Sequence, residues 1–398
     1  MNVPKLRFKE FDEEWGNQTL DRIVERIVRK NKNLESGLPL TISADKGLVD
    51  QITYFNKNVS GKDLSGYYLL KKGEFAYNKS YSNGYPWGAI KQLENYNQGL
   101  LSTLYICFKT TNVDDVFLKH YFETTHWYKE VSMIAAEGAR NHGLLNIPVN
   151  EFFKIKLSIP REREQKKIGD LFEKLNKKIQ LQQQKIDLLQ EQKKGFLQKM
   201  FPKAGERQPE MRLDGFMGDW EQRKLDDYFT ERSERSGSGE LISVTINLGV
   251  VRAADLDRRD SSSEDKSNYK VVKAGDIAYN SMRMWQGASG YSPYDGILSP
   301  AYTVIKPKED VYTQFFAYMF KRYDMIQTFR KNSQGLTSDT WNLKFPALKR
   351  IKVDVPSYDE QVKIAEFFKQ LDDTIALHQR KLDLYKEQKK GFMQQMFI

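Results

Sequence analysis

The sequence predicts an α+β protein in which two similar mixed α/β domains are separated by two long antiparallel coiled-coil helices, with an internal pseudo-two-fold repeat. A heptad-patterned segment occurs twice, 196 residues apart and without a gap. Other matching segments open and fill both halves of the chain. Short runs rich in Val, Ile, Tyr and Phe, bounded by Gly, Asn and Pro, are typical of strands.

The repeat divides the 398 residues into five parts. A heptad segment of about 40 residues predicts a rod of about 60 Å, which is longer than a globular core needs. The polar run Pro202–Pro209 ends the first rod and leads into the second half. The predicted parts are a first domain over 1–160, a central helix over 161–201, a linker over 202–210, a second domain over 211–356 and a C-terminal helix over 357–398.

The two rods carry the clearest periodicity in the chain. Within Glu164–Phe201 and Glu360–Phe397, apolar residues alternate at spacings of four and three, as in a coiled coil. A stripe this narrow needs a partner helix, and the simplest partner for each copy is the other. The predicted contact stripe, called the seam below, is formed by Ile168, Phe172, Leu175, Ile179, Gln182, Ile186 and Leu189 with Ile364, Phe368, Leu371, Ile375, His378, Leu382 and Tyr385.

A paired rod is a spacer. If the helices run antiparallel with aligned ends, polar Gln182 and His378 lie near the middle of the pair, where polar seam residues fix the register at some cost in stability. Two similar domains on such a pair are related by an approximate two-fold axis, and DNA has a matching pseudo-dyad.

The two domains repeat less strictly than the rods. The matched stretches are Pro4–Leu20 with Pro209–Leu225, Tyr67–Asn78 with Tyr269–Asn280, and the strand-like runs that end at Pro160 and Pro356. Between them, Val116–Glu137 and Val311–Lys331 are aromatic-rich helical stretches that we expect to pack on a sheet.

Composition narrows the class of protein. A hydrophobic content of 39% is ample for buried cores, and the net charge of +10 favours a polyanionic partner. The single cysteine, Cys107, excludes a disulfide framework and a cysteine-based zinc site, and fits a reducing compartment. The N-terminus lacks an apolar signal region, and no apolar run is long enough to span a membrane. We expect a soluble, cytoplasmic protein with no membrane partner.

Enzyme motifs are mostly missing. The chain contains no phosphate-binding loop, dinucleotide fingerprint or zinc-protease motif, and no NPPY-like tetrapeptide of an adenine methyltransferase. Glu191 with Lys193, and Glu387 with Lys389, match half of a nuclease motif, but they lie on the rods without the preceding Pro-Asp strand. The four histidines lack metal-ligand spacing. We therefore expect no catalytic residue and no metal site.

Polar, aromatic loops are the candidate DNA contacts of the first half. Arg and Asn side chains can read guanine and adenine edges, and aromatic rings interleaved with lysines suit nucleic acid, although they also suit ordinary packing. The loops Asn78–Gln92 and Gly138–Asn146 have this composition. Their candidate residues are Lys79, Tyr81, Asn83, Trp87, Lys91, Arg140, Asn141 and His142.

The second half has loops at the equivalent places, with different sequences. Asn280–Tyr291 follows the matched strand, and Arg330–Asn342 corresponds to the later loop. Their candidate residues are Asn280, Arg283, Trp285, Gln286, Arg330, Lys331, Ser333 and Gln334. Different loops on a shared frame are expected if two domains read two different sequences.

This arrangement resembles a known family, the specificity subunit of Type I restriction-modification enzymes. The resemblance covers the whole chain. It rests on the motif P-x-x-x-E-Q-x-K-I at the start of each rod, on EQKKGF near each rod's end, and on W-x-x-x-x-L near each domain's start. The motif residues are Pro160, Glu164, Gln165, Lys167 and Ile168, then Pro356, Glu360, Gln361, Lys363 and Ile364, with Trp15 to Leu20 and Trp220 to Leu225.

The resemblance implies a function. The two domains would be target recognition domains that each read part of a split, asymmetric site in double-stranded DNA, and the helices would set the gap. Two modification subunits would supply S-adenosylmethionine-dependent adenine N6 methylation, and restriction subunits would add ATP- and Mg-dependent translocation and cleavage. This chain would be non-catalytic and bind no cofactor itself.

Other classes stay open at the level of sequence. A stand-alone DNA-binding regulator would bind its site without partners. A nuclease with an unrecognised site would use the two E-x-K pairs. A purely structural coiled-coil protein would leave two aromatic-rich domains with divergent loops unexplained.

Overall fold

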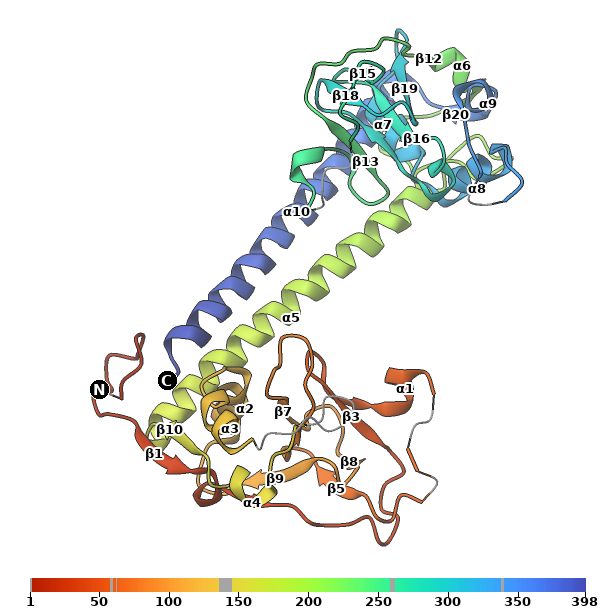
Figure 1. Cartoon of the computed structure of the whole chain (residues 1–398). Coiled ribbons are helices and arrows are strands. Elements are labelled where there is room, and N and C mark those ends of the chain that lie inside the picture. Colours follow the sequence, from red (N-terminus) through yellow and green to blue (C-terminus); the bar gives the residue numbers. More distant parts are fainter. Residues whose placement is uncertain (1, 58–59, 62, 136–144, 258–261, 338–339) are drawn as a thin grey trace. The chain divides into compact units, whose positions relative to one another are not determined.

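The computed structural model describes residues 2–57, 60–61, 63–135, 145–257, 262–337 and 340–398. Two helices of 38 residues each, α5 (Glu162–Lys199) and α10 (Tyr358–Gln395), are its longest elements (Figure 1). Packing divides the chain into two compact units, Met1–Gln182 with Lys381–Ile398, and Gln183–Arg380. Each unit therefore contains one sheet-rich domain together with part of each long helix.

The first unit is built on a four-stranded sheet in the order β2-β9-β6-β7. Smaller antiparallel pairs, β1-β10, β3-β4 and β5-β8, surround it. Its strands are β1 (Gly16–Thr19), β2 (Val24–Arg26), β3 (Leu40–Ser43), β4 (Gly47–Asp50), β5 (Tyr68–Lys71), β6 (Phe75–Asn78), β7 (Ala89–Gln92), β8 (Gln98–Leu101), β9 (Ile106–Thr110) and β10 (Lys156–Ile159). Its short helices are η1 (Leu20–Arg22), α1 (Gln51–Phe55), α2 (Asp115–Glu123), α3 (Tyr128–Ile134) and α4 (Val149–Phe152).

The second unit repeats this topology strand for strand. Its sheet has the order β12-β19-β16-β17, and the pairs are β11-β20, β13-β14 and β15-β18. Its strands are β11 (Glu221–Lys224), β12 (Phe229–Glu231), β13 (Ile242–Thr245), β14 (Gly249–Arg252), β15 (Lys270–Val272), β16 (Ile277–Asn280), β17 (Ser289–Tyr291), β18 (Gly296–Leu298), β19 (Tyr302–Pro307) and β20 (Lys352–Val355). Its short helices are α6 (Leu225–Tyr228), η3 (Ala253–Asp255), η4 (Met284–Gln286), α7 (Thr313–Met319), α8 (Tyr323–Asn332) and α9 (Phe345–Leu348). The predicted fold class and internal repeat are confirmed.

Each aromatic-rich stretch that was predicted to be helical forms two short helices, α2 and α3 in the first half and α7 and α8 in the second. In the first unit α2 ends at Glu123, where Thr124 takes an extended conformation and its hydroxyl donates to the carbonyl of Tyr121 at 2.6 Å. In the second unit α7 and α8 are separated by residues 320–322. Threonine side chains compete for backbone groups in this way, which ends helices.

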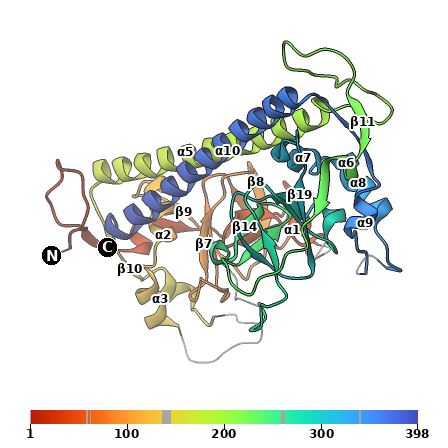
Figure 2. The ribbon, with the colours of Figure 1, turned by 90° about the horizontal axis from the view of Figure 1, so that it is seen from above.

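Each domain core is completed by a phenylalanine that lies just beyond the end of a long helix. In the first unit, the ring centroid of Phe397 lies 5.7 Å from that of Phe117 and 5.5 Å from that of Phe172 at the start of α5. In the second unit, Phe201 takes the same place, 5.3 Å from Phe315 and 6.2 Å from Phe368 at the start of α10. Within each unit, therefore, the beginning of one long helix contacts the end of the other, so the pairing is antiparallel (Figure 2).

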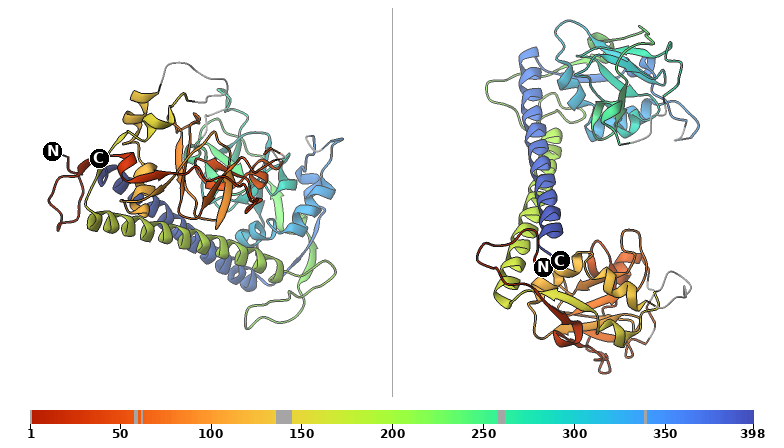
Figure 3. Two further views of the ribbon diagram at one scale, coloured as in Figure 1. Left: turned by 90° about the horizontal axis from the view of Figure 1, so that it is seen from below. Right: turned by 60° about the vertical axis from the view of Figure 1, so that its left-hand side comes forward.

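Backbone hydrogen bonds repeat this arrangement. The amide of Leu6 donates to the carbonyl of Gln395 at 2.9 Å, and the amide of Met211 donates to that of Lys199 at 2.9 Å. The segment that opens each half thus lies against the end of a long helix. Both chain termini consequently lie in the first unit, close together (Figure 3).

The P-x-x-x-E-Q motif has a structural role in both halves. Glu164 accepts two hydrogen bonds from Arg7, both at 2.7 Å, and Glu360 accepts two from Arg212 at 2.9 and 2.8 Å. Both carboxylates are 2% exposed. The motif glutamate therefore fixes the opening segment of each half to the first turn of a long helix.

The motif glutamine makes the second connection. Gln165 donates to the carbonyl of Pro160 at 2.8 Å and accepts from the amide of Asp114, the residue that caps α2. Gln361 does the same with Pro356 at 3.1 Å and with the amide before α7. One side chain thus orients the domain helix against the long helix.

The helices keep one register in both units. The ammonium of Lys178 lies 5.9 Å from the ring of Tyr385, and Phe196 contacts Phe367 with ring centroids 5.1 Å apart. Lys178 and Phe196 are 18 residues apart on α5, and their partners Tyr385 and Phe367 are 18 residues apart on α10 in the opposite direction, so both contacts fit the same antiparallel register.

The burial of the seam residues varies along the helices. Ile168, Phe172, Leu175, Ile186, Leu189, Ile364, Phe368 and Leu382 are buried, whereas Ile179, Gln182, Leu371, Ile375, His378 and Tyr385 are half-buried. The pairing of Gln182 with His378 stays a prediction, because these residues belong to different units.

Replacement of Arg212 tests the motif's structural role. Arg212→Met leaves the carboxylate of Glu360 buried without its partner, so we expect the free energy of unfolding to fall by about 3 kcal/mol, measured by urea denaturation. Lys363→Met is the matched control, because it removes an exposed ion pair with Glu366 on the same helix and should cost less than about 1 kcal/mol. Equal losses in the two variants would show that the buried pair has no special role.

Candidate nucleic-acid interface

One backbone hydrogen bond joins the two candidate loops in each half. In the first half the amide of Leu145 donates to the carbonyl of Lys79 at 2.7 Å. In the second half the amide of Leu343 donates to the carbonyl of Ser281 at 2.8 Å. The structure therefore brings together, in both domains, the two stretches that the sequence singled out separately.

The loop after the central strand has the same ends in both halves. It begins at Asn78 or Asn280, the last residue of β6 or β16, and closes at Gly88 or Gly287, whose φ angles are 79° and 85°. Side chains are strained at such angles, and a Cβ on Gly88 would collide with the carbonyl oxygen of Asn78. The frame is therefore fixed, while the residues between its ends, 79–87 and 281–286, differ in number and kind.

Aromatic rings connect the loops of the second half. Trp285, on η4, contacts Trp341 edge-to-face with ring centroids 5.2 Å apart. The guanidinium of Arg330, in the last turn of α8, lies 5.1 Å from the ring of Trp341. Arg330 and Arg283 are exposed, and Arg330 lies beside an indole ring, a composition suited to phosphate and base contact.

The other candidates of the second half have smaller roles or none that the structure shows. Asn280 accepts from the amide of Met282 at 3.0 Å, and the hydroxyl of Ser333 donates to the carbonyl of Phe329 at 2.8 Å. Gln334 is exposed and exchanges backbone hydrogen bonds with Asn342. Lys331 is exposed and Gln286 half-buried.

Trp341 was missed by the sequence analysis, although it falls inside a candidate loop. The interleaving of aromatic and basic residues that selected Trp285 applies equally to its surroundings. Its position beside Arg330 could not be read from the sequence, because the two residues are 11 positions apart along an irregular loop.

The first half is described only in part. Tyr81 is 61% exposed, Asn83 is exposed and Lys79 is half-buried. Trp87 packs against the domain core, and its carbonyl accepts from the hydroxyl of Tyr77 at 2.7 Å. The predicted contacts Arg140, Asn141 and His142 lie outside the described residues.

Lys91 differs from the other candidates of its loop. It lies on β7 rather than in the loop, and its ammonium is 5.8 Å from the ring of Tyr85. Burial lowers the pKa of Lys91, and Glu123 and Lys389 are among the nearby charges. Its surroundings are thus a packed charge cluster, unlike those of the exposed Tyr81.

The E-x-K lysines are engaged in ion pairs. Lys193 binds Asp372 at 2.5 Å, and Lys389 binds Glu123 at 3.1 Å. Glu191 and Glu387 are exposed. Across the described part of the chain, no group of three or more His, Cys, Asp or Glu side chains could hold a metal ion, and no helix there is long and apolar enough to cross a membrane.

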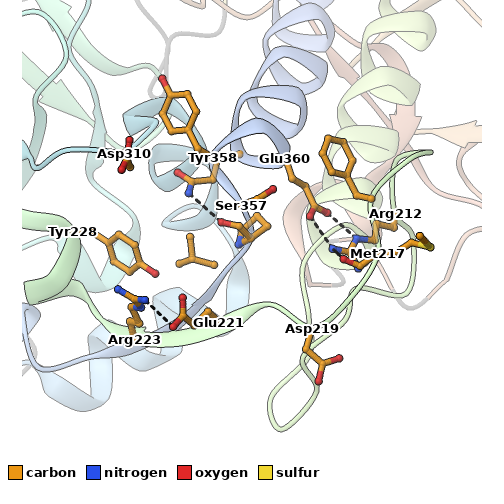
Figure 4. Close-up of a pocket in the computed structure, with 14 residues that line it drawn as sticks. Arg212, Met217, Asp219, Glu221, Arg223, Tyr228, Asp310, Ser357, Tyr358 and Glu360 are labelled. Carbon is orange, nitrogen blue, oxygen red and sulfur yellow. Dashed lines mark hydrogen bonds and ion pairs between the residues drawn. The ribbon is translucent and has the colours of Figure 1, made fainter.

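A cavity of about 390 Å³ lies beside the start of α10 (Figure 4). The arginines and glutamates that line it are paired with one another, because Arg212 binds Glu360 and Arg223 binds Glu221 at 2.7 Å. The cavity therefore belongs to the structural junction and does not add to the loops.

The two domains share a frame and carry unlike loops, and comparisons with known proteins show what such a chain is similar to. Residues 217–385 match the family described as the Type I restriction modification DNA specificity domain. The MjaVIII specificity subunit of Methanocaldococcus jannaschii is 23% identical over 322 residues, covering 74% of this chain and 73% of that protein. The putative MjaX specificity subunit of the same organism is 22% identical over 419 residues, covering 98% and 95%.

Solved structures share the fold. The S subunit of the type I restriction-modification system from M. genitalium superposes with a TM-score of 0.57 at 14% identity, over 100% of this chain and 99% of that one. A chain from a structural study of complex assembly in the type I system gives a TM-score of 0.54 at 13% identity, covering 97% of both chains. Residues 217–385 thus match a type I specificity domain, and over most of its length the chain is similar to specificity subunits of type I restriction-modification systems.

Arg283 tests the interface in the second domain. If its guanidinium contacts a guanine, Arg283→Ala should weaken reading at one position of one half-site by about 1 to 3 kcal/mol. The readout is selection of bound sequences from a random DNA pool. Lys352→Ala, an exposed lysine on β20, is the matched control and should leave the selected sequence unchanged. A change at the other half-site would show that the domains are wrongly assigned.

Proposed function

We propose that this chain reads a bipartite, asymmetric sequence in double-stranded DNA, with one half-site for each domain. The observation that carries the proposal is the shared loop frame with unlike loops. The bond from Leu145 to Lys79 and the bond from Leu343 to Ser281 place the loops equivalently, while the side chains they present differ. Two identical readers would select a palindrome, whereas two different readers select an asymmetric pair.

The helix pair acts as the spacer that sets the unspecified gap. Each helix has 38 residues, or about 57 Å at a 1.5 Å rise per residue. The matching register of Lys178 with Tyr385 and of Phe196 with Phe367 supports one continuous pairing. A rod of fixed length would hold the half-sites at a fixed separation.

The helices also serve as the scaffold for protein partners. Leu181 and Leu188 of α5 are 54% and 52% exposed, and their repeat equivalents Leu377 and Leu384 are exposed on α10. Leucines seven residues apart lie on one helical face, which suits a partner helix. The partners are two modification subunits and the restriction subunits.

Catalysis belongs to these partners. They supply S-adenosylmethionine-dependent adenine N6 methylation and ATP- and Mg-dependent cleavage, while this chain is non-catalytic and binds none of these cofactors. The ion-paired lysines of both E-x-K motifs support this division of labour. The exposed leucines favour a subunit of an assembly over a stand-alone regulator.

Mapping N6-methyladenine tests the proposal most directly. DNA is sequenced from cells that make this protein with its modification subunit, and the expected result is one bipartite, asymmetric motif with a constant gap. Cells that make the modification subunit alone are the control. A continuous or palindromic motif would contradict the proposal.

Lengthening both helices tests the spacer. Because Lys178 lies across from Tyr385, a heptad inserted after Leu181 is matched by one inserted after Lys381. The rod then grows by about 10 Å, so we expect the mapped gap to grow by about three base pairs. Seven residues added to the linker at Gly205 should leave the gap unchanged. The spacer idea fails if the double insertion folds, supports methylation and keeps the original gap.

Charge on the exposed leucines tests the scaffold. Leu181→Glu with Leu188→Glu should weaken binding of the purified modification subunit by at least about 100-fold, since two leucines lose their apolar contacts. Titration calorimetry measures the affinity. Gln184→Glu with Lys185→Glu, exposed on the same helix, is the control. Undiminished affinity in the leucine variant would place the partner elsewhere.

A further inference from the structure

A lysine of the second unit joins two loops that are far apart in the sequence. Lys321 lies in the turn between α7 and α8 and is half-buried. Its ammonium donates to the carbonyl of Gly287 at 2.7 Å and to the carbonyl of Ile246 at 2.9 Å. Gly287 closes the loop 281–286, and Ile246 lies at the tip of the β13–β14 hairpin.

We propose that Lys321 is a positioning residue for DNA recognition by the second domain. It holds the end of the loop that carries Arg283, Trp285 and Gln286 against the hairpin tip. This inference rests on the proposed function. Lys321 acts through the loop, since both of its described bonds go to backbone carbonyls within the protein.

A hydrogen bond to the carbonyl of Gly287 can fix the position of the loop 281–286, because Gly287 closes that loop. Gly287 has a φ of 85°, and its amide donates to the carbonyl of Met284 at 2.9 Å. The carbonyl of Gly287 also accepts from the amide of Ser289 at 2.9 Å, and the next amide, Ala288, donates to the carbonyl of Arg283 at 3.2 Å. Lys321 therefore adds to these local bonds the contact that ties a conformationally permissive glycine to the hairpin. A turn here would move η4, and with it the contact between Trp285 and Trp341.

The ammonium is kept in this place at a cost. Burial, together with the charge of Lys193, lowers the pKa of Lys321 to about 8. A buried cation is retained when its hydrogen bonds offset the free energy lost on desolvation. For Lys321, the two charge-assisted bonds to carbonyls provide this compensation. An apolar side chain would fill the space without this cost but would not hold the loop.

In the described part of the first half, no lysine takes the place of Lys321. Glu123 stands at the equivalent position of α2, and its carboxylate binds His120 at 3.2 Å and Lys389 at 3.1 Å. It makes none of the described hydrogen bonds to the first-half loop. The residue at this position thus differs between the two halves, as the loops do, whereas the frame around it is the same in both.

Space around Lys321 makes it suitable for substitution. It lines a cavity of about 500 Å³ together with Leu248 of the hairpin and Lys369 of α10. A side chain that borders a cavity can be replaced without overpacking a core. We therefore expect Lys321→Met and Lys321→Gln to fold, with melting temperatures close to that of the unmodified protein.

The experiment compares methylation motifs. The half-motif read by the second domain is identified first, as the one that changes when residues 282–286 are replaced by a Gly-Ser segment. Lys321→Met should then lower base preference in that half-motif by about tenfold and leave the other half-motif intact. Lys321→Gln, which keeps N–H donors, should fall between. Lys369→Met is the control, because its ammonium lines the same cavity but binds Asp373 at 2.7 Å.

The pH dependence of sequence discrimination distinguishes a role of the charged ammonium from a role in packing alone. In binding to purified duplexes, discrimination at the second half-site should decline as pH rises through about 8 for the unmodified protein, because a neutral amine donates weaker bonds. Lys321→Met should lack this decline, and Lys369→Met should retain it. The other titratable groups around the cavity are Lys193 on α5, Lys369 and Asp372 on α10, Tyr291 on β17 and Tyr318 on α7.

The outcomes separate the two proposals. An unchanged motif in Lys321→Met, or equal losses in both half-motifs, would overturn the role of Lys321 while leaving the bipartite reading intact. A pH response shared by Lys321→Met would also overturn it. If the unmodified protein directs no bipartite motif, the proposed function fails, and this inference fails with it.

Discussion

The structure depends on the exchange of helix ends between the two halves. Phe397, at the end of α10, fills the core that contains Trp15 and Phe117, and Phe201, at the end of α5, fills the core that contains Trp220 and Phe315. Buried aromatic rings are among the largest single contributions to a core. Neither domain is therefore complete without a helix that begins in the other half, and folding of the domains is coupled to antiparallel pairing.

The motif at the start of each helix makes this exchange specific. A coiled-coil stripe alone leaves the orientation of a helix against its domain undetermined, since apolar contacts are not directional. The buried pairs Arg7–Glu164 and Arg212–Glu360 are directional, and so are the amides of Gln165 and Gln361. Three side chains in each half thus fix where each long helix leaves its domain. The P-x-x-x-E-Q motif is explained by this joint without reference to catalysis.

The sequence predicted the features that produce a periodic pattern, but not those that depend on a single hydrogen bond. The two long helices and the duplication follow from spacings of four and three and from the 196-residue offset, and both are confirmed. The end of α2 coincides with one hydrogen bond from the hydroxyl of Thr124 to a backbone carbonyl. The link from Lys321 to Gly287 is likewise a hydrogen bond to a backbone carbonyl. Every residue has a backbone carbonyl, so the identity of the accepting residue gives no clue in the sequence to such a contact. For the same reason the loops could be proposed as regions, whereas Trp341 could not be placed beside Arg330.

The division between frame and loop would allow one chain to read two sequences, as the proposed function requires. What the halves share is backbone: a strand that ends in Asn, a glycine that closes the loop, and one amide-to-carbonyl bond between loops. What differs is the support behind each loop. In the first half burial and the nearby charges of Asp45 and Glu123 raise the pKa of Tyr85, and in the second Lys321 holds Gly287. Because these supports lie within each domain, a loop and its support can change together while the cores and the helix pair stay as they are. Specificity and assembly are thereby free to vary independently.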